Sequence, residues 1–486
     1  MKITLTFLAF LLLLSGTIGA APALPDQAPS DPAVEAARFA SVTGQVDLGG
    51  VVFGYLSVDG DLTAIGKYAN SFLDEMRKIQ PEVPPVNVPA LLKITGLDAI
   101  SALGFSSVAT ADGFRNKTYV HTPKGRRGLL RLMSGESKPF EVVALAPAGS
   151  DLVIEQDLNL KTLYESVLEV AGIAMGEQGK AMVQMVLKQP MPPPITFTME
   201  KVMADLDTKL TVIIDADPTK MMQLPDAPKE LKIPQLKGAV LIDGLGWVAD
   251  ELTKVLEPML AQGGKRKPPF KILRNANWVG MQLDLISASA ASEREKKEIS
   301  ELGLETALLA HHVPSGKLVL ASGKEFADKL FAPKPGLGQD PAFQKTMKDL
   351  PMEGTALSYA SPVFFSSLRK VFVKGIAEMD GDHNKDDRFA ATSLLNLLLP
   401  KNARGEGRVT TNTKDGMLTV SNSAHSHKTS LITGVASPVV MMIGAAAYRT
   451  NIVLEEMDFP EAEQIIEEVE HEHRSRPNRN SDKIGD

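Results

Sequence analysis

Four segments of the sequence open with small residues, continue as a short apolar strand and lead into a helix. The strands begin near residues 50, 150, 238 and 354, and the predicted helices cover 61–78, 160–170, 247–260 and 362–379. In the first helix, apolar side chains recur every three or four residues, which places them along one face. A chain built from such units is expected to fold as mixed α and β structure, with helices packed against a sheet.

Two of these segments resemble each other in detail. Tyr55 and Tyr359 stand at the same offset from Gly50 and Gly354, and a serine follows each tyrosine two residues later. The spacing between the four segments is uneven, so a solenoid, which needs a fixed period, is not indicated. A duplicated strand–helix unit is one interpretation. Chance similarity within a long α+β chain is the other.

Six further segments alternate in polarity as strands do, at 106–109, 117–121, 209–214, 317–321, 408–411 and 417–421. Turn residues separate some of them by only a few positions, which is typical of hairpins. We therefore predict an α+β fold of two related lobes, each a mainly antiparallel sheet with helices packed on one face. A proline-rich stretch at 224–234 sets the boundary, so the lobes are predicted at 39–230 and 231–430.

The first twenty residues have the pattern of a secretory signal peptide. Lys2 precedes an apolar run from Ile3 to Leu14, and small residues follow up to Ala20 and Ala23. The run is short for a membrane span, and small residues suit signal peptidase. Cleavage after Ala20 is predicted, with an uncleaved anchor as the alternative and 21–38 as a flexible lead. The protein is therefore expected in the periplasm or cell envelope.

A second apolar segment lies near the other end of the chain. Residues 431–448 carry no charge and have the mean hydropathy of a weak membrane span, although Gly434, Pro438 and Gly444 interrupt them. A C-terminal membrane anchor and a buried core element are both open interpretations. An acidic helix and a disordered polar tail are predicted over 449–486.

Composition excludes several classes of function. The net charge is −7 and aromatic residues make up 5% of the chain, so a nucleic-acid partner is not expected. The sequence has no cysteine, which excludes disulfides, thiolate metal sites and iron–sulfur clusters. No phosphate-binding loop, dinucleotide fingerprint or Gly-x-Ser-x-Gly motif occurs, and no cofactor is predicted.

One stretch of the chain carries a family resemblance. Gly316-Lys317-Leu318-Val319-Leu320-Ala321-Ser322 reads as a strand, and Asp340-Pro341-Ala342-Phe343 and Leu350-Pro351 follow it. Asp and Pro at those positions suit a helix start. With residues 98–107 and 126–130, this stretch resembles a bacterial family of exported proteins of unknown function. The resemblance covers most of 45–430, implies an envelope protein and supplies no catalytic residue.

Two groups of residues are weak candidates for a metal site. His425 and His427 stand at strand spacing, which would place both rings on one face, but no third ligand is evident. Asp380, Asp382 and Asn384 alternate like the start of a calcium loop, yet Lys385 replaces the central glycine and Ala391 the final glutamate. A polar strand face and a solvated acidic loop are the alternatives.

Catalysis has two weak candidate sets. Ser367 and Lys370 match a Ser-x-x-Lys pattern, and His383 lies in the acidic loop 380–387, where it could act with a carboxylate. An envelope hydrolase built on either set is our alternative prediction of function. No residue is assigned as catalytic in the leading prediction, which is a non-enzymatic exported protein that binds an envelope protein or an apolar ligand.

Methionines gather in the middle of the chain, at Met175, Met182, Met185, Met191, Met199, Met203, Met221 and Met222. Most have helical spacing, so filling a core is the default expectation. An adaptable apolar ligand cavity and a copper(I) site are the alternatives.

Overall fold

The computed structural model describes residues 31–81, 83, 86–191, 195, 197–203, 207–223, 232–261, 269–288, 296, 300, 305–377, 391–393, 395–396, 398–402 and 404–429. Ala23–Lys428 form one compact unit, and the chain ends, Met1–Pro22 with Thr429–Asp486, form another. The secondary structure below belongs to the first unit. The predicted signal peptide 1–20, the loop 380–387 and the segments 431–448 and 449–486 lie outside the described residues.

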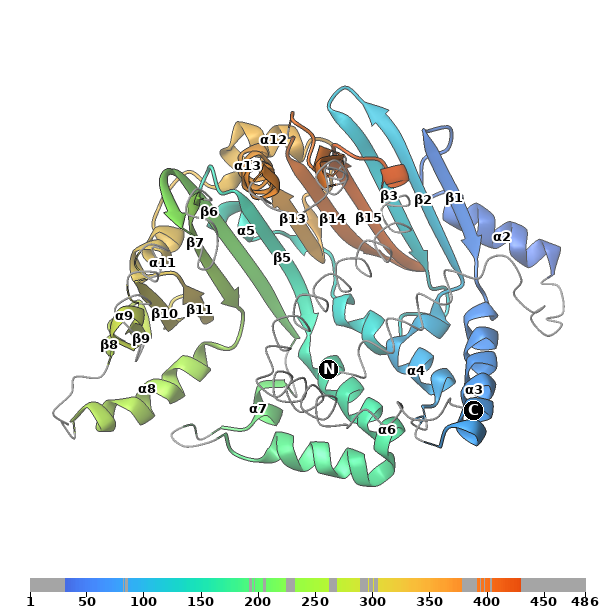
Figure 1. The fold of residues 1–486 in the computed structure, drawn as a ribbon, viewed down its shortest axis with the longest axis horizontal. Helices are drawn as coiled ribbons and strands as arrows, with labels where there is room; N and C mark the ends of the chain where they lie inside the picture. The colour runs from blue at the N-terminus through green and yellow to red at the C-terminus, as the bar shows by residue number, and fades with distance from the viewer. Residues whose placement is uncertain are drawn as a thin grey trace, which may run out of the picture. The chain divides into compact units, whose positions relative to one another are not determined.

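A large antiparallel sheet organises the first unit. Its strands lie side by side in the order β1-β2-β3-β15-β14-β13-β5-β6-β7-β11-β10-β9-β8 (Figure 1). The strands are β1 Val52–Ser57, β2 Ala102–Thr110, β3 Gly113–His121, β5 Leu152–Asn159, β6 Asp207–Gln223, β7 Lys232–Ile242, β8 Phe270–Arg274, β9 Trp278–Asp284, β10 Thr306–His312, β11 Lys317–Ala321, β13 Ala356–Ala360, β14 Glu406–Thr413 and β15 Gly416–Ser423. β4 (Lys138–Pro139) and β12 (Glu353–Gly354) pair separately. The predicted α+β class with a mainly antiparallel sheet is confirmed.

One order of connections recurs four times in the sheet. In β1-β2-β3, β5-β6-β7, β9-β10-β11 and β13-β14-β15, helix lies between the first two strands, and the third strand pairs with the second. Neighbouring groups meet third strand to third strand, as β3 with β15, or first strand to first strand, as β13 with β5. This is a recurrence of topology, and the duplication of sequence stays a prediction.

The described helices are α2 Pro32–Thr43, α3 Asp61–Ile79, α4 Val88–Thr95, α5 Val142–Leu145, α6 Leu160–Lys188, α7 Met199–Met203, α8 Gly246–Ala261, α9 Leu285–Ala288, α11 Lys324–Phe331, α12 Pro341–Thr346 and α13 Pro362–Ala377. Three short 3-10 helices cover η1 Leu97–Ala99, η2 Gly128–Met133 and η3 Leu337–Gln339. The four predicted helices correspond to α3, α6, α8 and α13.

Helix α2 corrects the described part of the flexible lead predicted over 21–38, because the residues from Pro32 onward are helical. The side chain of Asp31 accepts a hydrogen bond from the main-chain NH of Ala33 at 2.9 Å, and Pro32 occupies the first turn. Asp340 and Pro341 start α12 in the same way. An Asp cap and a preset proline φ favour a helix at both places, and the same Asp-Pro-Ala triplet begins each.

Helices pack on both faces of the sheet, whereas the prediction placed them on one. We call the face that carries Val153, Ile213, Leu241 and Val409 the core face, where these side chains are buried with residues of α5, α11 and α12. On the opposite face, which we call the second face, Ala249 of α8 and Leu245 just before the helix pack against Ile242, Leu309 and Leu318. Because neighbouring residues of a strand point to opposite faces, Leu241 and Ile242 serve different cores.

The sheet is continuous across the predicted lobe boundary at residue 230. β6 and β7, which flank that boundary, pair directly with each other. β13, β14 and β15 of the predicted second lobe lie between β3 and β5 of the first. The proline-rich stretch near 230 therefore connects two neighbouring strands of one sheet.

Candidate functional site

The two histidines proposed as metal ligands do not share a strand face. β15 ends at Ser423, before either of them. The ring Nε2 of His425 lies 3.1 Å from the carbonyl oxygen of Leu398. The Nε2 of His427 lies 3.3 Å from Thr118 Oγ1 and 3.2 Å from the carbonyl oxygen of Lys117. The prediction of a shared face was wrong, because the chain leaves the sheet at Ser423.

Metal ligation is not supported elsewhere in the described part of the chain. Among those residues, no group of three or more His, Asp or Glu side chains is arranged to hold a metal ion. Burial lowers the pKa of His427, which favours the neutral ring, and the ring serves as a hydrogen-bonding group. Asp380, Asp382 and Asn384, the candidate calcium ligands, lie outside the described residues, as does His383.

The Ser-x-x-Lys candidate lies on α13. Ser367 and Lys370 are one turn apart, and Lys370 is exposed. No hydrogen bond joins the two side chains in the described structure. Neither residue lines the cleft described next. The hydrolase alternative stays a prediction.

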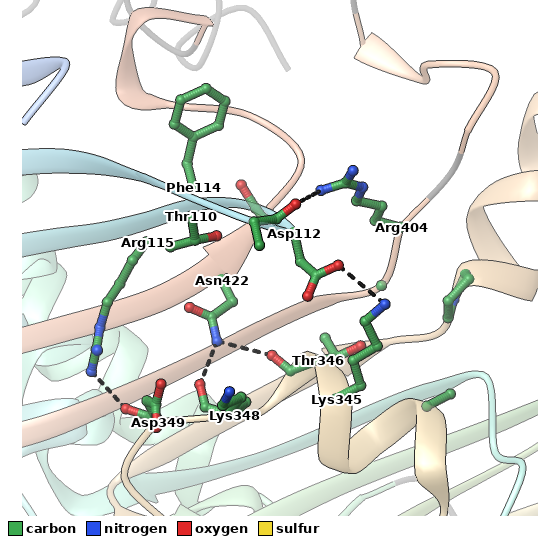
Figure 2. A pocket seen from close by; sticks show the side chains of 15 residues that line it. Thr110, Asp112, Phe114, Arg115, Lys345, Thr346, Lys348, Asp349, Arg404 and Asn422 are labelled. Atoms are coloured by element: carbon green, nitrogen blue, oxygen red, sulfur yellow. Dashed lines mark hydrogen bonds and ion pairs between the residues drawn. The ribbon is translucent and has the colours of Figure 1, made fainter.

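A cleft of about 350 Å³ lies where β2 and β15 end and β3 and β14 begin. The β2–β3 turn with the start of β3, helix α12 with the residues after it, the first residue of α13, the residues just before β14 and the end of β15 form its walls (Figure 2). In the sheet register Arg115 of β3 pairs with Asn422 of β15, which brings residues from distant parts of the sequence together. Its volume is in the range of small-ligand sites.

Cationic side chains outnumber carboxylates around the cleft. The cations are Arg115, Lys345, Lys348 and Arg404, and the carboxylates are Asp112 and Asp349, so the formal balance of four against two is +2. The chain as a whole has a net charge of −7. The cleft is therefore a locally positive region of an acidic protein, and it attracts anions.

The two arginines of the cleft donate to main-chain carbonyl groups. Arg115 Nη2 lies 2.6 Å from the carbonyl oxygen of Asp349, and Arg404 Nη1 lies 3.4 Å from that of Ala111. Figure 2 shows the two side chains on opposite sides of the cleft. Arg115 Nε is buried without a hydrogen-bond partner. Within the residues described, no carboxylate forms an ion pair with either guanidinium.

The lysine beside them is partly neutralised. Lys345 Nζ lies 3.1 Å from Asp112 Oδ1, and both side chains are well exposed. An exposed pair of this kind contributes roughly 0–1 kcal/mol, so an incoming anion can compete with Asp112 for the lysine.

The end of α12 and the loop after it, which carries Lys348, are held in place by an asparagine. Asn422 Nδ2 donates to the carbonyl oxygens of Thr346 at 3.0 Å and Lys348 at 2.8 Å. Asp349 follows with φ +62°, the one non-glycine residue with positive φ in the described chain. A left-handed conformation is costly for a residue with a Cβ, and such strain gathers at functional sites. The wall of the cleft is therefore fixed before any ligand binds.

A second group of charges, on the core face, is already neutralised internally. Glu155 lies 2.9 Å from Lys209 Nζ and accepts a hydrogen bond from the NH of Val142 at 2.6 Å. Lys317 pairs with Glu141 at 3.1 Å and Asp243 at 2.5 Å. Burial alone would lower the pKa of Lys209, but the hydrogen bond and charge of Glu155 raise it above its ordinary value. This network holds α5 on the sheet.

The methionines of α6 do not fill a core, contrary to the default expectation. Met175, Met182 and Met185 on α6 are 49%, 49% and 56% exposed. They do not line the cleft.

Comparisons with known proteins give no indication of function, so the proposal below is based on the cleft. No family model matches the chain, and no curated protein or solved structure is significantly similar to it. Among the described helices, none combines the length and apolar character of a membrane span.

The cleft itself was not predicted from the sequence. Its residues come from five separate stretches, and no motif joins them. The one local signal was the Asp-Pro-Ala-Phe helix start, which positions Lys345 and the loop after it.

Proposed function

We propose that this chain is an exported, non-enzymatic binding protein, and that its cleft binds an oxyanion, a carboxylate or phosphate group, of its ligand. The observation that carries the proposal is the pair of guanidinium groups of Arg115 and Arg404, which lie on opposite sides of the cleft and donate to main-chain carbonyls, with no carboxylate partner among the described residues. Guanidinium groups bind carboxylates and phosphates through paired N–H donors in a fixed geometry.

The proposal sharpens the prediction made from the sequence. An envelope protein or an apolar ligand was expected, and the cationic walls favour a partner that presents an acidic group. Lys345 and Lys348 also line the cleft and add positive charge to it. The site contains no nucleophile held by a base, which supports binding over catalysis.

Binding is tested by isothermal titration of the full chain at low ionic strength. Inorganic phosphate and succinate serve as separate probes, so the two sources of the oxyanion are distinguished. Arg404→Gln and Arg115→Gln should each weaken binding roughly tenfold or more, because a hydrogen bond to a charged group contributes about 1.5–3 kcal/mol. Added salt should weaken it further, since the cleft is open to solvent.

Arg274→Gln is the matched control. Arg274 is an exposed arginine on β8, at the far end of the strand order, and it pairs with Glu257 at 2.9 Å. The Arg274→Gln variant should bind both probes as tightly as the unmodified chain does. Absence of binding for both probes, or equal weakening in all three variants, would contradict the proposed site.

Export is tested separately by fractionation and N-terminal sequencing. The mature chain is expected outside the cytoplasm, with its first residue near Ala21. A cytoplasmic chain that retains Met1 or Lys2 would rule out the exported part of the proposal and leave the binding test unaffected.

A further inference from the structure

The two edges of the large sheet differ in how they meet the solvent. β1 is the last strand at one edge and β8 at the other. β8 carries exposed Lys271 and Arg274. Charged side chains on an edge strand prevent it from pairing with other strands. The stretch 51–58, Val-Val-Phe-Gly-Tyr-Leu-Ser-Val, contains no charged residue and no proline.

Among the residues that the structure describes, none pairs with the main-chain groups on the outer side of β1. The NH of Val58 donates to the carbonyl oxygen of Ser101, and β1 pairs with β2 in the register Val52↔Ser107 to Ser57↔Ala102. In an antiparallel pair, alternate residues bond to the same neighbour. Residues 52, 54 and 56 therefore bond to β2, and the NH and CO groups of Phe53, Tyr55 and Ser57 point outward.

Apolar side chains surround this edge. Phe53 is 39% exposed and Leu56 53% exposed, and they lie on opposite faces of the strand. Phe39 of α2 is also exposed and packs edge to face on Tyr55, with ring centroids 5.0 Å apart. The nearby charged groups are already paired, because Arg38 binds Glu35 and Asp59. The edge thus offers a hydrogen-bonding strand with an apolar border.

We propose that β1 pairs with β1 of a second copy of this chain, so that the two sheets join edge to edge. The open groups are symmetric about Tyr55: in an antiparallel pair centred there, Phe53 faces Ser57 of the other copy and Tyr55 faces its equivalent. All the outward groups of residues 53, 55 and 57 are then satisfied. Leu56 comes opposite Gly54 of the other copy, beside the Phe105 ring that lies over that glycine.

A second copy fits this edge because two uncharged β1 strands do not repel each other when they pair. The same pairing at β8 would bring Lys271 and Arg274 of two copies together, and like charges opposite each other are destabilising. A short strand pair with a few apolar side chains is a small interface, so the dimer is expected to dissociate on dilution. This inference is independent of the oxyanion cleft.

Sedimentation velocity of the full chain over a wide range of concentration tests the dimer. The unmodified chain should change from monomer to dimer, and Phe53→Lys or Leu56→Lys should raise the dissociation constant at least about tenfold, because each removes an apolar contact and places a charged side chain on the pairing edge. Lys271→Gln at the other edge should leave it unchanged. Circular dichroism and thermal melting check that each variant is folded.

A cross-link tests the register. The sequence has no cysteine, so Tyr55→Cys supplies the only thiol, and its Cα should lie about 5.5 Å from that of the other copy, within the reach of a disulfide. A covalent dimer that forms under mild oxidation from Tyr55→Cys and not from Lys271→Cys supports the pairing. A chain that stays monomeric at all concentrations, or a dimer that Phe53→Lys and Leu56→Lys both retain, would overturn it.

Discussion

The core-face helices and the outer helices of this molecule differ in how they use apolar side chains. The core-face helices α11 and α12 bury their large apolar residues, and Phe326, Leu330 and Phe343 are each at most 5% exposed. The outer helices α3, α6 and α13 leave many of theirs in solvent, among them Tyr68, Phe72, Met175, Met182, Met185, Val186, Phe372 and Val373. No large apolar residue of α11 or α12 is comparably exposed.

The difference teaches where the stability of the sheet resides. Phe343 packs edge to face on Tyr359 of β13, with centroids 5.0 Å apart, and this contact ties α12 to the sheet. α13 follows the same strand, yet none of its described residues is fully buried. Free energy from apolar burial scales with the area removed from water, so the core face should dominate the folding energy.

The largest expected effect comes from replacing one phenylalanine by alanine in a core-face helix and one in an outer helix. Phe343→Ala should lower the free energy of unfolding by about 3–5 kcal/mol, because it opens a cavity in the core. Phe372→Ala on α13, where the side chain is 49% exposed, should lower it by less than about 1.5 kcal/mol. Urea unfolding followed by circular dichroism measures both. Equal losses would refute the contrast between the two groups of helices.

A smaller effect should appear as pH dependence of the core face. Burial lowers the pKa of His312 below 6.5, because its ring stacks on Phe331 at 3.6 Å and packs beside Trp278. The unfolded chain then takes up a proton at a pH where the folded chain does not. The stability that depends on neutral His312 is complete above the unfolded pKa and is lost as pH falls toward the folded pKa.

The measurement compares unfolding at about pH 7.5 and about pH 5.5. The unmodified chain should lose stability on acidification, and His312→Gln should lose less, whatever its absolute stability. His121 and His427 also have pKa values lowered by burial, so part of the dependence should remain. An identical pH slope in the His312→Gln variant would contradict the assignment.

The smallest effect concerns methionines. Met185→Gln on α6 should change the free energy of unfolding by no more than about 0.5 kcal/mol, since its side chain already lies in water. Met347→Gln is the matched substitution on the core face, where the side chain is 4% exposed, and it should cost more than about 1 kcal/mol. Thermal or urea unfolding compares the pair. A costly Met185→Gln would show that α6 is packed in solution.

Local sequence signals predicted the elements well and their assembly poorly. The strand at 317–321 and the helices α3, α8 and α13 were expected almost to their ends, because apolar periodicity and helix-start residues act within a few positions. The same Asp-Pro-Ala start was recognised at Asp340 and missed at Asp31, where the surrounding alanines and prolines read as a flexible lead. The prediction that His425 and His427 share a strand face was wrong because it extended the strand beyond Ser423, where β15 ends.

The candidate cleft could not have been found by such signals. Arg115 and Asn422 are brought together by the β3–β15 pairing, across about three hundred residues of sequence. A sequence pattern predicts which residues face a core, and it carries no information on which strands become neighbours.

What the sequence by itself determined is therefore the set of strands and helices, the α+β class, the lack of disulfide chemistry and the acidic character of the chain. The order of the strands, the distribution of helices over both faces and the positive cleft were decided by the tertiary structure. The physical reason is that periodicity and capping depend on residues a few positions apart. Strand pairing and the convergence of charges depend instead on contacts between residues that are remote in the chain.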